Sequence, residues 1–356
     1  MDATAFKPAQ IHGFLVSQVG YDAGRFKQAL LRSTDPGWLD GCRFVARDVY
    51  NGRTFLNGTV ERWGDKWNST WWTIPFTDLY RKGTYRLHVF RGDAEVALSD
   101  PFDVAEDLVW DKTIDTVCFE QFESRARQAR HGLGWKDCGS DWRECGSHTF
   151  ALIGLCDLLQ DGFDFLGSDR QKRLGEIIRH GCRFLCALMD RAAAAGMPAG
   201  SSVHEVPGHM LQIPGDVVSA SMALGCASRL LGDWWPEEAA DWLRRAESLF
   251  QRFLSMEPYG PDGFSSINRG LPEGTKPEGF MTRDLAMALW AGMQLVNSGK
   301  VELRETLFGL AQQILERQIR EAQAECGYWG HFREFASLPH SEKANTHHDV
   351  GHDTGT

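Results

Sequence analysis

Residues 135–148 read Trp-Lys-Asp-Cys-Gly-Ser-Asp-Trp-Arg-Glu-Cys-Gly-Ser-His, and this stretch decides how the rest of the chain is interpreted. It places three carboxylates and two tryptophans in a turn-like segment, and an apolar run with helical spacing begins at Thr149. The acids could simply cap that helix. They also suit sugar-bond cleavage, in which one carboxylate activates water, a second protonates the leaving oxygen, and aromatic faces hold the sugar rings. The flanking sequence favours the second interpretation.

Upstream of this stretch, residues 10–105 predict an antiparallel β-sandwich domain. Short alternating runs of apolar and polar residues are separated by turn signals, which is typical of such a domain. The expected strands lie at 14–20, 28–32, 43–47, 71–76 and 84–90. The expected turns lie at 35–37, 51–52, 57–58 and 82–83.

Downstream, residues 106–356 change to a helical period and predict an α/α domain. The expected helices cover 108–129, 147–160, 169–195, 214–231, 236–256, 280–298 and 301–322. Successive amphipathic helices of this length indicate hairpins stacked in a ring. Such a ring places alternate loops at one face, where a site can form.

The composition of the chain limits the classes of partner that it can bind. The net charge is −10, and no basic run supports nucleic-acid binding. No apolar stretch is long enough to span a membrane, and residues 1–14 have no apolar core of a signal peptide. The chain has nine cysteines, an odd number, and most of them lie in expected helices. Together with the missing signal peptide, this predicts a cytoplasmic protein with reduced thiols, although a processed secreted form stays open. No phosphate loop or dinucleotide fingerprint is present, so we expect no cofactor.

The two halves together resemble family 9 glycoside hydrolases of the cellulase or exo-glucosaminidase type. Residues 16–21 (Val-Ser-Gln-Val-Gly-Tyr) and 83–87 resemble the immunoglobulin-like domain that precedes many of these catalytic domains. Residues 142–148 look like the family's W-x-D-A-G-D-Y loop, 214–217 like a G-S-D-V-A helix start, and 278–290 like the D-E-L-A-W-A-A-L-W helix. The resemblance covers most of the chain and implies a β-sandwich followed by an (α/α)6-type barrel.

The resemblance also implies which residues act on water, because both aspartates of the family's D-A-G-D hold the attacking molecule and the second is the base. Aligned on Trp142, Glu144 takes the first position and Ser147 the second, and a serine is a poor base. A shifted alignment pairs Asp141 with Glu144 at the same spacing. We therefore expect Glu144 and Asp141 to be catalytic, the alternative being a relative that has lost catalysis.

The barrel is expected to be incomplete at the C-terminus. The family barrel has twelve helices and a catalytic glutamate near its C-terminal end, whereas about seven helices are expected here and no segment matches that glutamate. A fragment of a longer protein explains this most simply. A second chain that completes the ring through self-association, and an adapted fold, are the alternatives.

Further polar and aromatic residues are candidates for sugar binding. The loop 201–209 is expected near the Glu144 loop in a ring of hairpins. Asp216 precedes an apolar helix, so capping is its default role. The histidines of the C-terminal tail have spacings seen on metal-binding helices, but Gly351 and Gly355 argue against a helix there, and we expect no metal. The expected substrate-binding residues are Trp142, Asp137, His148, His204, His209, Trp329, His347, His348 and Asp349.

These observations predict a glycoside hydrolase that cleaves β-glycosidic bonds of oligosaccharides with inversion. Inversion places the two carboxyl groups about 6.5–9.5 Å apart so that water fits between them. Cello-oligosaccharides and glucosamine oligomers are the expected substrates, the latter because an acidic site suits a cationic sugar. A non-catalytic carbohydrate-binding relative is the main alternative. A polysaccharide lyase is a weaker one, because the acidic balance argues against a uronate substrate.

Overall fold

The computed structural model describes residues 12–130, 132–137, 141–208, 210, 212–258, 279–323 and 329–333. The chain divides into two compact units, Met1–Val117 and Cys118–Thr356. The last strand of the first unit ends at Ala105, and helix α1 (Leu108–Asp115) is also part of that unit. Among the described residues, no helix combines the length and apolar character needed to cross a membrane.

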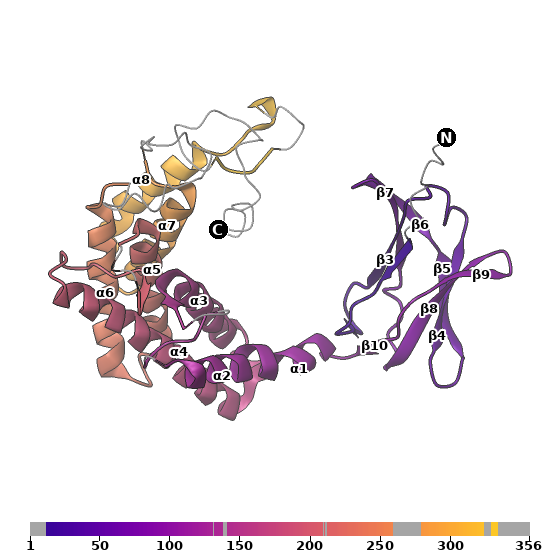
Figure 1. Ribbon diagram of the computed structural model, residues 1–356, viewed down its shortest axis with the longest axis horizontal. Helices are drawn as coiled ribbons and strands as arrows, with labels where there is room; N and C mark the ends of the chain where they lie inside the picture. The colour runs from indigo at the N-terminus through magenta and orange to yellow at the C-terminus, as the bar shows by residue number, and fades with distance from the viewer. Residues whose placement is uncertain are drawn as a thin grey trace, which may run out of the picture. The chain divides into compact units, whose positions relative to one another are not determined.

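The first unit is a sandwich of two facing sheets, as expected (Figure 1). One sheet has the order β1-β3-β7-β6, and the other has the order β2-β10-β8-β4-β5 with β9 paired to β8. All pairs are antiparallel except β2 with β10. The strands are β1 His12–Leu15, β2 Tyr21–Asp22, β3 Gln28–Ser33, β4 Arg43–Asp48, β5 Thr54–Thr59, β6 Glu61–Lys66, β7 Ser69–Pro75, β8 Gly83–Arg91, β9 Ala94–Leu98 and β10 Phe102–Ala105.

The strands of this sandwich alternate buried and exposed side chains, and the buried ones pack into a core between the two sheets. In β3 every second residue is buried, and β8 buries Tyr85, Leu87 and Val89 toward the same core as Trp72. The expected turn at 57–58 is wrong, because both residues lie inside β5. Gly58 is there for packing: a Cβ on it would lie 2.6 Å from the Phe44 ring.

The second unit consists mainly of helical hairpins. After a π-helical turn at Thr116–Glu120 and helix α2 (Gln121–Gln128), the described part of the unit contains three pairs in chain order. They are α3 Cys145–Asp161 with α4 Phe163–Ala194, α5 Pro214–Leu231 with α6 Pro236–Leu254, and α7 Thr282–Asn297 with α8 Arg304–Leu315. Short 3-10 turns cover Val301–Leu303 and Glu321–Gln323. The expected helices are confirmed in position with three differences: the one expected at 108–129 is interrupted by the π-helical turn, the one expected at 169–195 begins at Phe163, and the one expected at 301–322 ends at Leu315.

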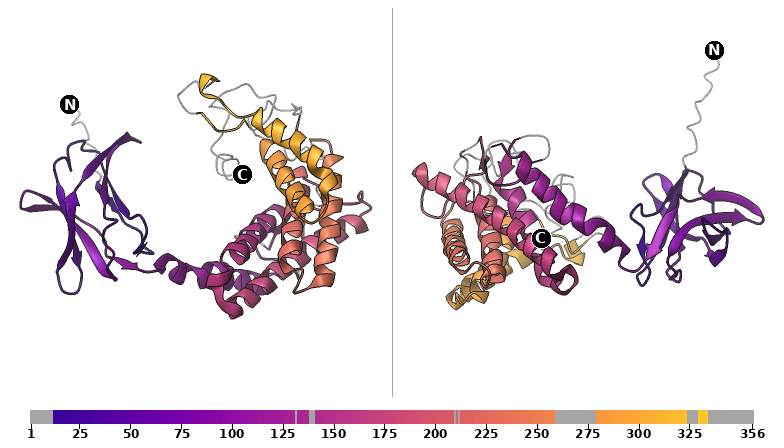
Figure 2. Two further views of the ribbon diagram at one scale, coloured as in Figure 1. Left: turned by 180° about the vertical axis from the view of Figure 1, so that it is seen from behind. Right: turned by 90° about the horizontal axis from the view of Figure 1, so that it is seen from below.

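The inner helices α3, α5 and α7 pack side by side, and each carries its partner on the outside (Figures 1 and 2). Helix α5 touches α3, α6 and α7, and its side chains are buried almost all round. Its alanines, serines and glycines permit this close approach: a Cβ on Gly225 would lie 3.1 Å from Cβ of Gln294 on α7. This arrangement is the expected ring of hairpins, represented here in part.

An ion-pair cluster joins the outer helices α4 and α6. Glu238 accepts hydrogen bonds from Nε of Arg179 at 2.7 Å and from Arg183 at 2.6 Å. The hydrogen bond from Arg179 lowers the pKa of Glu238 from 4.5 to about 2. Partial burial opposes this shift, and Arg183 adds to it. Because the folded-state pKa is depressed, the pair stabilises the protein above pH 4.5, and this stabilisation is lost as the pH falls from there toward 2.

We expect this loss to be measurable by urea denaturation between neutral and acidic pH. With the carboxylate 31% exposed and screened, the contribution is about 1–2 kcal/mol. Between neutral and acidic pH, the unfolding free energy of the wild type should fall by this amount more than that of the Glu238→Gln variant. The exposed neighbour provides a matched control, since Glu237→Gln should follow the wild type. Identical acid profiles for wild type and Glu238→Gln would contradict the assignment.

Candidate active site

The segment before α3 and the loop before α5 form a two-stranded sheet. Strand β11 (Arg143–Glu144) pairs antiparallel with β12 (Glu205–Val206), and the backbone N–H of Cys145 donates to the carbonyl of His204 at 2.7 Å. The expected proximity of the two loops is thus confirmed. The register sets Glu144 directly opposite Glu205, so the two carboxylate side chains share one face.

An acidic residue lies at the start of each inner helix, with Glu144 at the N-cap of α3, Asp216 in the first turn of α5 and Asp284 in the first turn of α7. A Cβ on Gly146 in α3 would lie 3.1 Å from Oδ1 of Asp216, and one on Gly215 in α5 would lie 2.8 Å from Oδ1 of Asp284. The glycines therefore allow the acid of the next helix to approach. Unpaired amides at helix N-termini favour negative charge, which suits this row of carboxylates.

Glu144 is the half-buried centre of this region. Burial raises the pKa of Glu144, and the negative charges of Asp137, Asp216 and Glu205 raise it further, against the opposing influence of His204. A carboxylate with a raised pKa in a partly dry site has the properties of a general base or a general acid.

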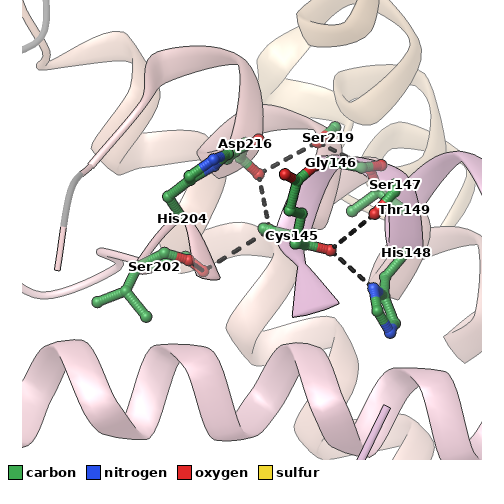
Figure 3. Close-up of polar contacts among 11 residues, drawn as sticks. Cys145, Gly146, Ser147, His148, Thr149, Ser202, His204, Asp216 and Ser219 are labelled. Atoms are coloured by element: carbon green, nitrogen blue, oxygen red, sulfur yellow. Dashed lines mark hydrogen bonds and ion pairs between the residues drawn. The ribbon is translucent and has the colours of Figure 1, made fainter. Parts of the chain in front are cut away.

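His204 and Asp216 form a close pair (Figure 3). Nδ1 of His204 lies 2.6 Å from Oδ2 of Asp216. Burial lowers the pKa of His204, but the hydrogen bond to Asp216 and the charge of Glu144 outweigh it, so the pKa is raised. The default capping role of Asp216 is wrong, because α5 has no side-chain cap and the carboxylate binds His204 instead.

His148 is a buried residue that fixes the backbone of Glu144. It is 3% exposed; its Nδ1 donates to the carbonyl of Glu144 at 2.7 Å, and its Nε2 accepts the Trp135 N–H at 2.7 Å. Its ring stacks on Trp135 at 5.1 Å between centroids and lies 4.1 Å from Phe184. With burial lowering the pKa of His148 to about 4, the ring is neutral at pH 7. Both ring nitrogens are engaged, so in this arrangement His148 positions Glu144 and offers no group to a sugar.

Asp141 lies among cations. It pairs with Arg130 at 3.4 Å and with Lys136 at 3.9 Å. The backbone N–H of Asp137 donates to the carbonyl of Trp142 at 3.0 Å, and Trp142 is 42% exposed. The negative charge of Asp137 raises the pKa of Glu144.

The remaining candidates lie elsewhere or outside the described residues. Trp329 is 60% exposed and precedes a short segment that pairs with residues 318–319. Ser147, the residue at the family's base position, is exposed and donates to the carbonyl of Glu144 at 3.3 Å. Residues outside the described part of the chain are His209, His347, His348 and Asp349.

Glu205 belongs to the loop that the sequence places near Glu144 as a candidate sugar subsite, but neither its burial nor the bond between His204 and Asp216 was predicted. Glu205 is completely buried, and nothing in its local pattern announces this. The twelve-residue separation of His204 from Asp216 likewise gives no signal. Only the pairing of β11 with β12 brings these groups to Glu144.

The fold is that of family 9 glycoside hydrolases, with an immunoglobulin-like sandwich followed by part of an (α/α)6 barrel. A metagenome-derived family 9 endoglucanase is 17% identical with a TM-score of 0.61, over 85% of this chain and 64% of that one. A family 9 glycoside hydrolase from Bacteroides ovatus is 17% identical with a TM-score of 0.59, over 83% and 63%. A mutant of a thermostable endoglucanase from Alicyclobacillus acidocaldarius is 15% identical with a TM-score of 0.58, over 84% and 62%.

At the level of sequence, no protein-family model and no curated protein matches the chain. The likeness is therefore one of fold. The chain spans less than two thirds of the length of these three solved structures.

Proposed function

We propose that this chain hydrolyses β-glycosidic bonds of oligosaccharides, with Glu144 drawing a proton from the attacking water. The observation that carries the proposal is the place of Glu144: half-buried, with a raised pKa, at the start of an inner helix. Endoglucanases with the same fold support a carbohydrate as the ligand.

The second carboxylate at the site does not serve as the acid of an inverting reaction. Glu205 is fully buried and cannot reach a leaving oxygen. Its oxygen also lies within 4.8 Å of the Glu144 oxygen, closer than the roughly 6.5–9.5 Å between carboxyl groups that leaves room for water. The proposal thus assigns Glu144 as the base. Inversion requires a general acid farther from Glu144 than Glu205 is.

Cello-oligosaccharides and glucosamine oligomers are the substrates we propose. The acids around Glu144 suit a cationic amino sugar as well as the hydroxyls of a neutral one. The test is hydrolysis of cello-oligosaccharides, chitosan oligomers and aryl β-glycosides. We expect turnover of at least one class, and turnover of none by the folded protein would contradict the proposal.

A second candidate function is carbohydrate binding without turnover. It is favoured by Ser147, whose hydroxyl takes the place of the family's base and bonds to the Glu144 carbonyl. Calorimetric titration with the same sugars separates the two functions: binding without product release would establish this alternative.

A further inference from the structure

Three side chains at the paired strands form a donor set for a metal ion. Glu144, His204 and Glu205 each offer one donor atom, and these atoms lie within 4.8 Å of one another. Metal–ligand bonds of about 2.0–2.2 Å place tetrahedral donors about 3.4 Å apart, so small side-chain rotations close this set. The strand register holds the two glutamates opposite each other, and the Cys145–His204 backbone bond holds the histidine beside them.

The surroundings of His204 match those of a metal-binding histidine. Such a histidine typically donates its other ring N–H to a carboxylate, which fixes the ring and its tautomer. Asp216 provides this contact to Nδ1 at 2.6 Å, so a metal would bind through Nε2. Asp216 is itself 7% exposed and held at the start of α5.

The charge balance also points to a cation. Glu144 and Glu205 face each other, and like charges directly opposite across paired strands repel. The charges of Asp137 and Asp216 act on the same spot. One divalent cation would offset this repulsion.

We propose that Glu144, His204 and Glu205 bind one divalent transition-metal ion of the Zn²⁺ class, with Asp216 orienting His204. Three protein ligands leave a fourth position open, as in metal sites that exchange ligands. The inference goes beyond the proposed function, because a metal-bound Glu144 cannot act as a base. Metal occupancy and hydrolysis at Glu144 are therefore mutually exclusive states of the site.

The test is a titration with Co²⁺ followed by competition with Zn²⁺, without sugar. The parent is the full chain with His347, His348 and His352 changed to alanine, which removes the histidine-rich tail as a competing ligand. We expect one Co²⁺ per chain, with visible d–d bands and without the ultraviolet band of a cysteine–cobalt bond. Because binding is read without turnover, the result stands whether or not the chain is a hydrolase.

The variants locate the ion. Asp216→Asn should weaken binding about 10–100-fold, as loss of an outer-shell partner does. His204→Gln and Glu205→Gln should abolish the visible bands in protein whose circular dichroism is unchanged. The matched control is His88→Gln, a histidine that pairs with Glu95 at 2.7 Å in the sandwich and should bind cobalt like the parent.

Glu144→Gln keeps the proposal testable even if the buried variants fail to fold, because Glu144 is only half-buried. It should weaken cobalt binding at least tenfold. Parent-like affinity in Glu144→Gln would overturn the proposal. So would the absence of binding by the folded parent at millimolar metal.

Discussion

Glu144→Gln is expected to lower the rate of oligosaccharide hydrolysis about a thousandfold, within the range typical for loss of a general base. Glutamine keeps the shape of the side chain and leaves the backbone contacts of residue 144 intact, including the hydrogen bond from His148. The melting temperature should therefore change little. The measurement is the initial rate on whichever substrate the wild type cleaves, with folding checked by circular dichroism.

Asp141→Asn is the matched control, since it makes the same chemical change three residues away. Asp141 is held by Arg130 and Lys136, and we expect its loss to cost less than tenfold in rate. If Asp141→Asn were as damaging as Glu144→Gln, the two carboxylates would act together on water, as the shifted alignment implies. If Glu144→Gln stayed active, the assignment of the base would be wrong.

His148→Leu is expected to destabilise the helical unit by about 3 kcal/mol, because it leaves one buried and one partly buried backbone group with one fewer partner. The Trp135 N–H loses its acceptor, and the Glu144 carbonyl loses the Nδ1–H donor. The stacked Trp135 ring and the neighbouring Phe184 also lose their contact. Urea denaturation measures the effect, and activity in the folded fraction should fall because the Glu144 backbone is no longer fixed.

The matched control for this variant is His180→Leu. Nε2 of His180 lies 3.1 Å from N and 3.2 Å from O of Gly134, and its side chain is only partly buried. We expect a loss of less than about 1.5 kcal/mol, the value of one ordinary hydrogen bond. Equal effects of the two substitutions would contradict a special role for His148.

Much of the fold could be predicted because its signals are local. The period-two pattern of β3 and β8 and the helical period from α3 to α8 are written in neighbouring residues. Asn57-Gly58 shows where local signals fail, because glycine is needed at position 58 to leave room for the Phe44 ring on another strand. Edge strand β6 also lacked a clear signal, since most of its side chains face solvent.

The site was predicted in part. Glu144 stands out in a short acidic and aromatic stretch, and the loop with His204 was expected beside it. Its partners depend on contacts between distant residues: Asp216 reaches the loop residue His204 from the start of α5, and Glu205 meets Glu144 through strand pairing. The same applies to Asp141, whose ion pair with Arg130 is a tertiary contact. Sequence spacing alone could not separate Asp141 from Glu144.

The most direct test of the central claim is proton NMR of the anomeric protons while the purified chain acts on a β-linked oligosaccharide. The account predicts product release with the α-anomer formed first, before mutarotation, and no release with Glu144→Gln. Release of the β-anomer first would contradict inversion. Absence of any product from the folded wild type on both cello- and glucosamine oligomers would contradict the hydrolase itself.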